Sequence, residues 1–424
     1  MKFSFLHVAD IHLGRAFSGN FKNIKSTDIF SNAMKKVLEN IFQSALSKNV
    51  DFVLIAGDTF DSDESDFASK LIFKEFLNKL DFANIKVFVI CGNHDNINSY
   101  SKTIFNYDED SNIKIIGLNT PSLCKLPVFN KEKDLICALH ALSYNSPQFL
   151  ENPVKYFEKP LIEERNLFHI GILHCDVTAD KSSCYAPCSL NDLKDLNYDY
   201  FALGHIHLPA SLEKNIVYSG TVQGRNSKET GIHGIRYVEV DSNNIVKNEF
   251  VQTDVIRYEN LEIDVSNAPD LAAAFYLITD TLRDFLSSQK NLCEAYILKL
   301  NITGKVAFYS QIDDSFYSVF CERINNEFNG KILVSEVSNS LKPFIDLKLL
   351  AFDDGITGEL YKTAVNDEAK NQLFEELNLQ LKSVLSKCDF TEEEFLNFKN
   401  TVLESASNDC ISICSDLYRG MNDE

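Results

Sequence analysis

The chain has 424 residues, 45% of them hydrophobic, and a formal net charge of −20 at pH 7. This length predicts two or three domains, and the hydrophobic content excludes a largely disordered chain. The negative charge argues against broad electrostatic adhesion to nucleic acid or membranes, although bound divalent cations can supply positive charge locally for a phosphate substrate.

The sequence offers no apolar run near the roughly 18 residues that a membrane-spanning helix needs. Residues 1–10 turn acidic too early for a signal peptide and are expected to begin a strand. We therefore expect a cytoplasmic protein with no membrane partner. The eleven cysteines are scattered and odd in number, which is typical of reduced, buried thiols. A structural zinc at Cys175, Cys184 and Cys188 is the alternative, but their spacing lacks a second cysteine pair.

Up to about residue 250, short apolar runs alternate with segments of helical periodicity. Strands are predicted at residues 3–9, 52–56, 87–90, 113–118, 135–139, 168–173 and 200–203. Helices are predicted at residues 27–46, with Thr27 as the N-cap, and at residues 67–80. This alternation predicts an α/β fold in which helices flank the sheets. Such folds place their ligands at the carboxyl ends of the strands.

Five of these strands end in side chains that can bind a metal or move a proton. The ends carry Asp10 and His12; Asp58; Asn93, His94 and Asp95; His174; and His205 with His207. A turn would explain residues 92–95 alone equally well, but five such coincidences in a chain with nine histidines are improbable. Oxygen and imidazole ligands without thiolate suit Mn, Fe, Zn or Mg. Seven ligands suit two ions about 3.5–4 Å apart that share a carboxylate and clamp a phosphoryl group.

These strand ends resemble the signature of the calcineurin-like metallophosphoesterases over roughly the first 230 residues. The matching motifs are Asp10-x-His12, Gly57-Asp58, Gly92-Asn93-His94-Asp95, His174 and Gly204-His205-x-His207. The resemblance implies a four-layer αββα sandwich over residues 1–252. It implies that Asp10, His12 and His207 hold one metal, that Asn93, His174 and His205 hold the other, and that Asp58 bridges them. It also implies that His94 assists the leaving oxygen and that Asp95 positions His94, in keeping with histidine chemistry near neutral pH.

Residues 7–14 and 57–61 are similar to the DNA-repair nuclease branch of this superfamily, and residues 59–62 lack the arginine of its protein phosphatases. Residues 218–225 and 229–231 resemble SbcD-type nucleases, especially the YhaO-like subgroup. The resemblance implies two divalent ions, Mn²⁺ first, with Mg²⁺, Fe²⁺ or Zn²⁺ as alternatives. Asp61 stands where archaeal and eukaryotic members have a histidine tied to exonuclease action, so the resemblance leaves the polarity and strength of exonuclease action open.

Residues 220–231 are rich in glycine and permit two interpretations. They can form a plain hairpin connection. They can also form a wall beside the metals, with Arg225 contacting the phosphate of the substrate. His7 and His233 are expected to be structural, and no specific signal assigns His140 to the site.

Beyond residue 252 the metal-binding pattern ceases. Residues 253–350 are predicted to form a small α+β unit, with helices at 271–286 and 318–328 and strands at 295–302 and 331–337. By position this unit resembles the capping domain of the nuclease branch. A dimerisation or packing module is equally compatible with its residues.

Residues 351–424 are predicted to be helical and acidic. From residue 366 onward there are five Lys or Arg and thirteen Asp or Glu, which gives a net charge of −8. A capping box at residues 391–394 separates two apolar stripes, the first of which contains Leu373, Leu377, Leu381, Val384 and Leu385. These helices either pack on the body or dock a partner. In the resembling family such a segment binds an SbcC-type ABC ATPase, and this chain has no P-loop of its own.

We therefore predict a metal-dependent DNA nuclease of the repair type, an exonuclease or endonuclease, that hydrolyses phosphodiester bonds with two metals. The first alternative is a phosphodiesterase or phosphatase for nucleotides or other small molecules, which the negative charge favours. The second is a non-catalytic DNA-end scaffold, which the complete set of ligands disfavours. The expected partners are DNA, an SbcC-type ABC ATPase and a second copy of the chain.

Overall fold

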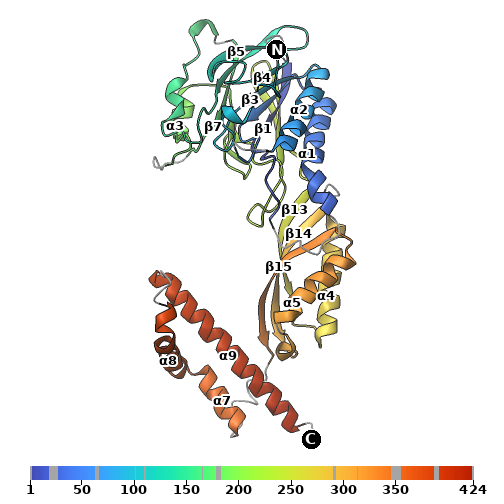
Figure 1. The fold of residues 1–424 in the computed structure, drawn as a ribbon, viewed down its shortest axis with the longest axis vertical. Helices are drawn as coiled ribbons and strands as arrows, with labels where there is room; N and C mark the ends of the chain where they lie inside the picture. The colour runs from blue at the N-terminus through green and yellow to red at the C-terminus, as the bar shows by residue number, and fades with distance from the viewer. Residues whose placement is uncertain are drawn as a thin grey trace. The chain divides into compact units, whose positions relative to one another are not determined.

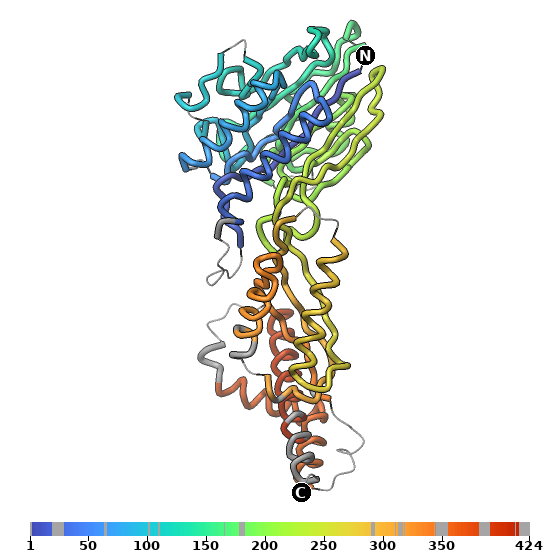
Figure 2. Tube along the Cα trace, turned by 90° about the vertical axis from the view of Figure 1, so that its right-hand side faces the viewer, coloured from blue at the N-terminus to red at the C-terminus, as the bar shows by residue number. Residues whose placement is uncertain are grey.

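A computed structural model describes residues 2–18, 27–62, 66–100, 102–108, 111–164, 166–177, 183–289, 293–312, 314–344, 355–385 and 391–422. The colours in Figures 1 and 2 follow the chain from its N-terminus to its C-terminus. The chain divides into two compact units. The first unit comprises Met1–Glu259, Asn291–Ile297 and Gly330–Ile332, and the second comprises Asn260–Lys290, Leu298–Asn329 and Leu333–Glu424. In the described part of the chain, no helix is long and apolar enough to cross a membrane. The predicted domain boundaries after residues 252 and 350 stay predictions.

The first unit contains two six-stranded sheets. Across the first sheet the order is β12 (Asn244–Gln252), β11 (Gly234–Asp241), β1 (Lys2–Val8), β2 (Phe52–Ala56), β3 (Lys86–Ile90) and β4 (Ile113–Ile115). Across the second the order is β5 (Leu123–Phe129), β6 (Leu135–Leu142), β7 (Phe168–His174), β8 (Tyr200–Gly204), β10 (Ile216–Tyr218) and β9 (Ala210–Glu213). Four adjacent strands in each sheet are parallel, so their carboxyl ends lie together.

The two sheets pack face to face through a core rich in aromatic side chains. Phe5 of β1 stacks on Phe52 of β2, with ring centroids 4.9 Å apart. Across the interface, Phe5 meets Tyr200 edge-on at 5.3 Å and Phe3 meets Phe168 at 5.4 Å. All five rings are buried, and burial of each is worth roughly 1.5–3 kcal/mol. This core fixes one sheet against the other and thereby fixes the positions of their strand ends.

Helices α1 (Thr27–Ser47) and α2 (Phe67–Phe82) lie beside the first sheet (Figure 1). Asp66 caps α2 by accepting a hydrogen bond from the Ser69 amide at 2.7 Å. Near the second sheet the helices are short: α3 (Leu190–Asp195), η2 (Pro153–Tyr156) and η3 (Ile162–Glu164), while η1 (Ile97–Ser99) follows β3. The predicted α/β class is confirmed. The predicted cap at Thr27 concerns a side chain outside those that the structure describes.

Every strand predicted in the first 250 residues is present, but several strands are not predicted. Strands β9 and β10 have four and three residues, too few to form a clear apolar run, and β5 and β12 bury only part of their side chains. The strand predicted at 113–118 ends at Ile115. There the Ile115 amide donates to the Asn119 side chain at 2.9 Å, and Gly117 has a φ of +94°, so the chain turns.

Most of a three-stranded sheet belongs to the second unit, in the order β13 (Ile256–Asp264), β14 (Ala295–Val306) and β15 (Ile332–Pro343). Helices α4 (Leu271–Ser288) and α5 (Asp314–Glu327) and the short η4 (Tyr309–Gln311) complete this part. Phe275 of α4 meets Phe320 of α5 edge-on at 5.8 Å. The helices and strands predicted here are present, and β13 is an addition.

The C-terminal part contains α7 (Ile356–Val365), α8 (Asp367–Leu385) and α9 (Glu392–Asn422). The capping box at the start of α9 is confirmed, since the Glu394 amide donates to Thr391 Oγ1 at 3.2 Å and the Thr391 amide donates to the Glu394 carboxylate at 2.8 Å. Helix α7 lies within residues 351–424, the segment predicted to be helical, although no separate helix is predicted at residues 356–365. The two described members of the predicted stripe on α8 are exposed, Leu373 at 59% and Leu377 at 39%, and the buried side chain of α8 is instead Phe374. The side chains of Leu381, Val384 and Leu385 lie outside the described set.

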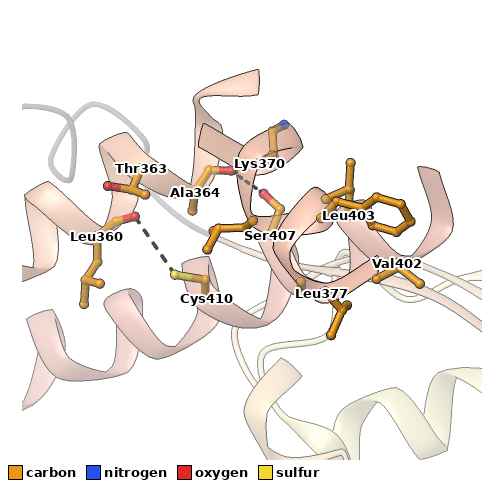
Figure 3. A pocket seen from close by; sticks show the side chains of 12 residues that line it. Leu360, Thr363, Ala364, Lys370, Leu377, Val402, Leu403, Ser407 and Cys410 are labelled. Carbon is orange, nitrogen blue, oxygen red and sulfur yellow. Dashed lines mark hydrogen bonds between the residues drawn. The ribbon is translucent and has the colours of Figure 1, made fainter. Parts of the chain in front are cut away.

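An apolar groove runs between these three helices (Figure 3). It has a volume of about 270 Å³ and is lined mainly by aliphatic side chains, among them Leu360, Leu377, Val402 and Leu403. Two hydrogen bonds tie α7 to α9 at its edge, from Ser407 Oγ to the Ala364 carbonyl at 2.7 Å and from Cys410 Sγ to the Leu360 carbonyl at 4.0 Å.

Candidate metal centre

The strand ends that carry the predicted ligands come from both sheets and meet at one place. The His205 amide, after β8, donates to both carboxylate oxygens of Asp10, after β1, at 3.1 and 3.2 Å. His174, at the end of β7, donates from Nδ1 to the carbonyl of Ala56, the last residue of β2, at 2.9 Å. The centre thus lies at the carboxyl ends of strands, as predicted, and it is shared by the edges of two stacked sheets.

One half of the centre consists of Asp10, His12 and His207, whose ligand atoms all lie within 4.8 Å of one another. The Nε2 atoms of His12 and His207 are 3.0 Å apart. Asp10 and His12 are buried, and His207 is half-buried. Two imidazole nitrogens and a buried carboxylate that converge in this way fit a divalent cation.

The other half consists of Asn93, His174 and His205. Asn93 Oδ1 lies 2.9 Å from His174 Nε2 and 3.2 Å from His205 Nδ1. Asp58 Oδ2 lies 3.4 Å from His174 Nε2 and 3.7 Å from His12 Nε2, between the two halves. The structure thus brings all seven predicted ligands together, and their positions are compatible with the implied partition, which stays a prediction.

Three of the histidines are held at the nitrogen that faces away from the centre. His207 Nδ1 lies 2.9 Å from Glu229 Oε1, His12 Nδ1 lies 3.3 Å from Asp61 Oδ1, and His174 Nδ1 donates to a backbone carbonyl. Such partners set the ring orientation and leave Nε2 for a metal. Sequence reasoning missed Glu229 as a site residue, although it lies in a stretch that the family resemblance singled out.

The backbone at the centre is strained in a consistent way. Four of the seven predicted ligands have positive φ angles: Asp10 (+53°), His12 (+48°), Asp58 (+51°) and His205 (+104°). Each such residue costs on the order of 1–3 kcal/mol and persists only where the surroundings impose it. Here the Asp10 amide donates to the Gly57 carbonyl at 3.1 Å, and the His12 amide donates to the Asp58 carbonyl at 2.9 Å.

Two glycines permit the close approach of these strand ends. A Cβ at Gly204 would lie 2.0 Å from the Ala56 carbonyl oxygen, and a Cβ at Gly92 would lie 2.2 Å from Asp58 Oδ1. Either contact would push the strand ends apart. The glycines in these motifs are therefore required by the packing of the centre.

Charge at the centre also favours a cation. Among the described residues, Asp10 and Asp58 form no ion pair with a lysine or arginine, and both are buried. Burial raises the pKa of Asp10. Burial also opposes ionisation of Asp58, but His174 and His12 outweigh it and lower the pKa of this carboxyl. Burial lowers the pKa of His174, and Asp58 overcompensates and raises it to about 9. Divalent ions would satisfy these carboxylates directly.

His94 lies at the rim of the centre with an exposed side chain. Its ring centroid is 5.0 Å from that of His12, its Nδ1 lies 2.8 Å from the Asp61 carbonyl oxygen, and its amide donates to Asp58 Oδ1 at 2.9 Å. The position suits a group that meets a substrate, while the backbone amide helps to hold Asp58.

The contacts of Asp95 do not favour the expectation that it positions the His94 ring, which stays a prediction. Asp95 is fully buried, and its carboxylate accepts hydrogen bonds from the amides of Gly92, Asp58, Thr59 and Phe60 and from the Tyr100 hydroxyl. Burial, followed by the charge of Asp58, raises the pKa of Asp95 to about 7. Asp95 therefore ties the loop after β2 to the loop after β3, and the Asp61 carbonyl holds the His94 ring.

Arg225 is 3% exposed, which does not favour its predicted contact with substrate. Its guanidinium donates to the carbonyls of Arg15 at 2.7 Å and His12 at 3.3 Å, and it lies over the Phe17 ring at 4.6 Å. Arg225 thus clamps the backbone that follows Asp10 and His12. The substrate contact of Arg225 stays a prediction.

Other residues named from the sequence lie apart from the centre. His7 bonds to the Tyr200 hydroxyl and the Leu203 carbonyl, both at 3.1 Å, and His233 lies 3.1 Å from the Glu229 carbonyl, as structural residues would. His140 pairs with His169 at 3.0 Å in the second sheet. None of the ten described cysteines forms a disulfide. The metal-binding clusters found among the described residues contain no cysteine, so a zinc at Cys175 has no support.

Residues 3–209 match the family model described as Calcineurin-like phosphoesterase. The chain is 29% identical over 307 residues to the uncharacterized metallophosphoesterase YhaO of Bacillus subtilis, covering 70% of this chain and 71% of YhaO. It is 27% identical over 288 residues to the DNA double-strand break repair protein Mre11 of Archaeoglobus fulgidus, covering 63% and 60%. It is 23% identical over 279 residues to SbcD, a component of the nuclease SbcCD of Staphylococcus epidermidis, covering 59% and 70%.

Proposed function

Because residues 3–209 form a calcineurin-like metallophosphoesterase domain with relatives of the YhaO, SbcD and Mre11 types, we propose that this protein is a two-metal DNA nuclease of the cytoplasm. The observation that carries the proposal is the convergence of seven oxygen and imidazole ligands on one centre, with an exposed histidine at its rim. The domain's family comprises phosphoesterases, which use divalent metals. For this protein we propose Mn²⁺ as the ion and DNA as the substrate.

In this proposal Asp10, His12 and His207 would hold one cation and Asn93, His174 and His205 the other, with Asp58 placed to serve both. When bound, two such ions supply positive charge to the phosphoryl group and activate water for attack on phosphorus. The chain's own residues orient this charge: Glu229 and Asp61 hold the rings of His207 and His12 from behind, and the bonded backbone loops fix both aspartates.

His94 supplies the proton that the leaving oxygen needs. When its ring carries two protons, Nδ1–H donates to the Asp61 carbonyl at 2.8 Å, which leaves Nε2–H to protonate the departing oxygen. The ring then becomes the neutral Nδ1–H tautomer, still bonded to the same carbonyl. An exposed ring with one fixed nitrogen is well placed for this role.

DNA is preferred over a small ester for two reasons. Two of the relatives are named for a nuclease and for DNA double-strand break repair, and residues 220–231 resemble the nuclease branch. The net charge of −20 is the argument for the alternative, a phosphodiesterase for nucleotides or other small molecules. A partner that contributes a basic surface would reconcile the charge with DNA.

The test is to incubate the Mn²⁺-loaded protein with single- and double-stranded DNA, with cyclic nucleotides and with bis-p-nitrophenyl phosphate. We expect DNA cleavage that falls about 10²–10⁴-fold in His94→Ala, the usual share of a general acid, while bound manganese is unchanged. His140→Gln is the matched control and should cleave normally, because His140 lies apart from the centre.

Three results would contradict parts of this proposal. Turnover of small esters with intact DNA would replace the substrate by the small-molecule alternative. Metal binding without any hydrolysis would favour the DNA-end scaffold. Loss of manganese in His94→Ala would make His94 a ligand and remove its assigned role.

For the C-terminal segment we propose that the groove between α7, α8 and α9 docks an SbcC-type ABC ATPase. Residues 366–424 carry a net charge of −8 around an apolar groove of about 270 Å³, which suits a helical partner with basic flanks. Leu377→Glu places a charge in the groove. In size-exclusion chromatography of this protein mixed with the purified ABC ATPase, the variant should no longer co-elute with the ATPase. Co-elution by the variant would contradict docking at this groove, and self-association of the chain alone that Leu377→Glu abolishes would identify a second copy as the occupant.

A further inference from the structure

Arg15 lies between the two carboxylates that hold metal-centre histidines. Its Nη1 is 3.8 Å from Glu229 Oε1, and its Nε is 3.9 Å from Asp61 Oδ1. Glu229 contacts His207, and Asp61 contacts His12. In the described part of the chain, Arg15 is the only lysine or arginine that forms an ion pair with either carboxylate. A single guanidinium therefore faces both supports of one half of the centre.

The donors of Arg15 remain available for a further anion. Both carboxylate contacts are longer than a hydrogen bond, and its guanidinium makes no hydrogen bond within the described residues. The side chain is 31% exposed, whereas the ligands His12 and Asp58 behind it are buried. Arg15 can thus accept a ligand from solvent without leaving its present position.

The loop that carries Arg15 is fixed by hydrogen bonds to the backbone of Arg15. The Arg15 amide donates to the His12 carbonyl at 3.2 Å, and Arg225 donates to the Arg15 carbonyl at 2.7 Å. Arg225 itself is 3% exposed and stacks on Phe17. The two arginines therefore have different roles. Arg225 fixes the backbone of the loop at His12 and Arg15, and the Arg15 side chain reaches the exposed rim of the metal centre.

We propose that Arg15 binds a non-bridging oxygen of the substrate phosphate at the metal centre. A planar guanidinium recognises phosphate through two parallel, charge-assisted hydrogen bonds. A phosphate that approaches this half of the centre otherwise meets the charges of Asp61 and Glu229. Arg15 offsets this repulsion at the point where the anion enters. The proposal rests on the proposed phosphoesterase function and assigns it a substrate-binding residue that is open to solvent.

The test compares wild type, Arg15→Gln and Arg15→Lys in three measurements. Bound manganese is counted by metal analysis, affinity for inorganic phosphate is measured calorimetrically on the Mn²⁺-loaded protein, and kcat and KM are measured with bis-p-nitrophenyl phosphate. Arg283→Gln is the matched control, since Arg283 is 52% exposed on α4 in the second unit. We expect Arg15→Gln to retain manganese and to bind phosphate about 10–100-fold more weakly, as the loss of a charged hydrogen-bond pair predicts. Arg15→Lys should recover part of the affinity, because it keeps the charge without the planar fork.

Each other outcome overturns a different claim. Unchanged phosphate affinity in Arg15→Gln, with an active wild type, overturns the role of Arg15 and leaves the phosphoesterase function intact. Loss of manganese in Arg15→Gln overturns the proposal by showing that Arg15 acts on the metal ligands through Glu229 and Asp61. A wild type that binds phosphate through Arg15 but hydrolyses no ester overturns the proposed function and leaves phosphate binding by Arg15 intact. A manganese-loaded wild type that neither binds phosphate nor hydrolyses any ester overturns both.

Discussion

The two units of this chain differ sharply in the chemistry that their residues allow. All nine histidines lie between residues 7 and 233 in the first unit, and the second unit has none. The first unit collects its polar residues at the carboxyl ends of parallel strands, whereas the second carries acidic helices around an apolar groove. Converging strand ends can hold several ligands rigidly, and helix pairs offer extended surfaces instead. We therefore expect catalysis in the first unit and recognition of a partner in the second.

The largest difference between the units is expected when one carboxylate is removed from each. Asp58→Asn should lower hydrolysis of bis-p-nitrophenyl phosphate by about 10³-fold or more and reduce bound manganese, because Asp58 lies between both ligand sets and metal catalysis is worth several kcal/mol. Asp284→Asn, on the exposed side of α4, should change neither quantity. Rate assays and metal analysis of both variants provide the measurement, and comparable losses in both would contradict the assignment.

A core substitution in the second unit tests whether the packing of its helices affects hydrolysis. Phe374 is buried and meets Phe395 and Phe398 with ring centroids 6.1 and 6.4 Å away. Phe374→Ala should destabilise the α8–α9 packing by about 3–5 kcal/mol and leave ester hydrolysis unchanged. Hydrogen exchange of the α8 and α9 amides, measured alongside the hydrolysis rate, checks both parts. Leu379→Ala, on a side chain that is 72% exposed, is the control, and a fall in hydrolysis with Phe374→Ala would mean that the units are functionally coupled.

The smallest expected effect concerns pH. Burial, followed by the neighbouring His169 and Lys125, lowers the pKa of His140 to about 3 in the folded protein. Below its unfolded pKa of about 6.5 the unfolded chain takes up a proton that the folded chain refuses, so stability is lost as pH falls from about 6.5 toward 3. This residue should cost the first unit roughly 2 kcal/mol between pH 6.5 and 5. His140→Gln should flatten that dependence in denaturant unfolding measured at both pH values, and an unchanged slope would show that His140 does not contribute.

Local pattern was enough to predict the strands that carry the site and the side chains that meet there. An apolar run such as residues 87–90 followed by Asn93 and His94 is a signal within a few positions of the chain, because a buried strand and its polar end are adjacent in sequence. The same holds for the capping box at residues 391–394. Short or partly exposed elements such as β9, β10 and α7 have no comparable signal, because they depend on neighbours that lie elsewhere in the chain.

The supports of the site could be found only in the tertiary structure. His12 and His207 are 195 positions apart, and Arg225 lies 210 positions from Arg15. Single contacts between residues so far apart produce no periodic pattern in the sequence. The side chains that can bind metal, and the strands that present them, follow from the sequence alone. The packing of two sheets decided that their edges form one centre, that Asp95 ties two loops together, and that Arg225 is buried while Arg15 reaches the rim. The physical reason is that ligand identity is a local property, whereas ring orientation, burial and access depend on residues brought together only by folding.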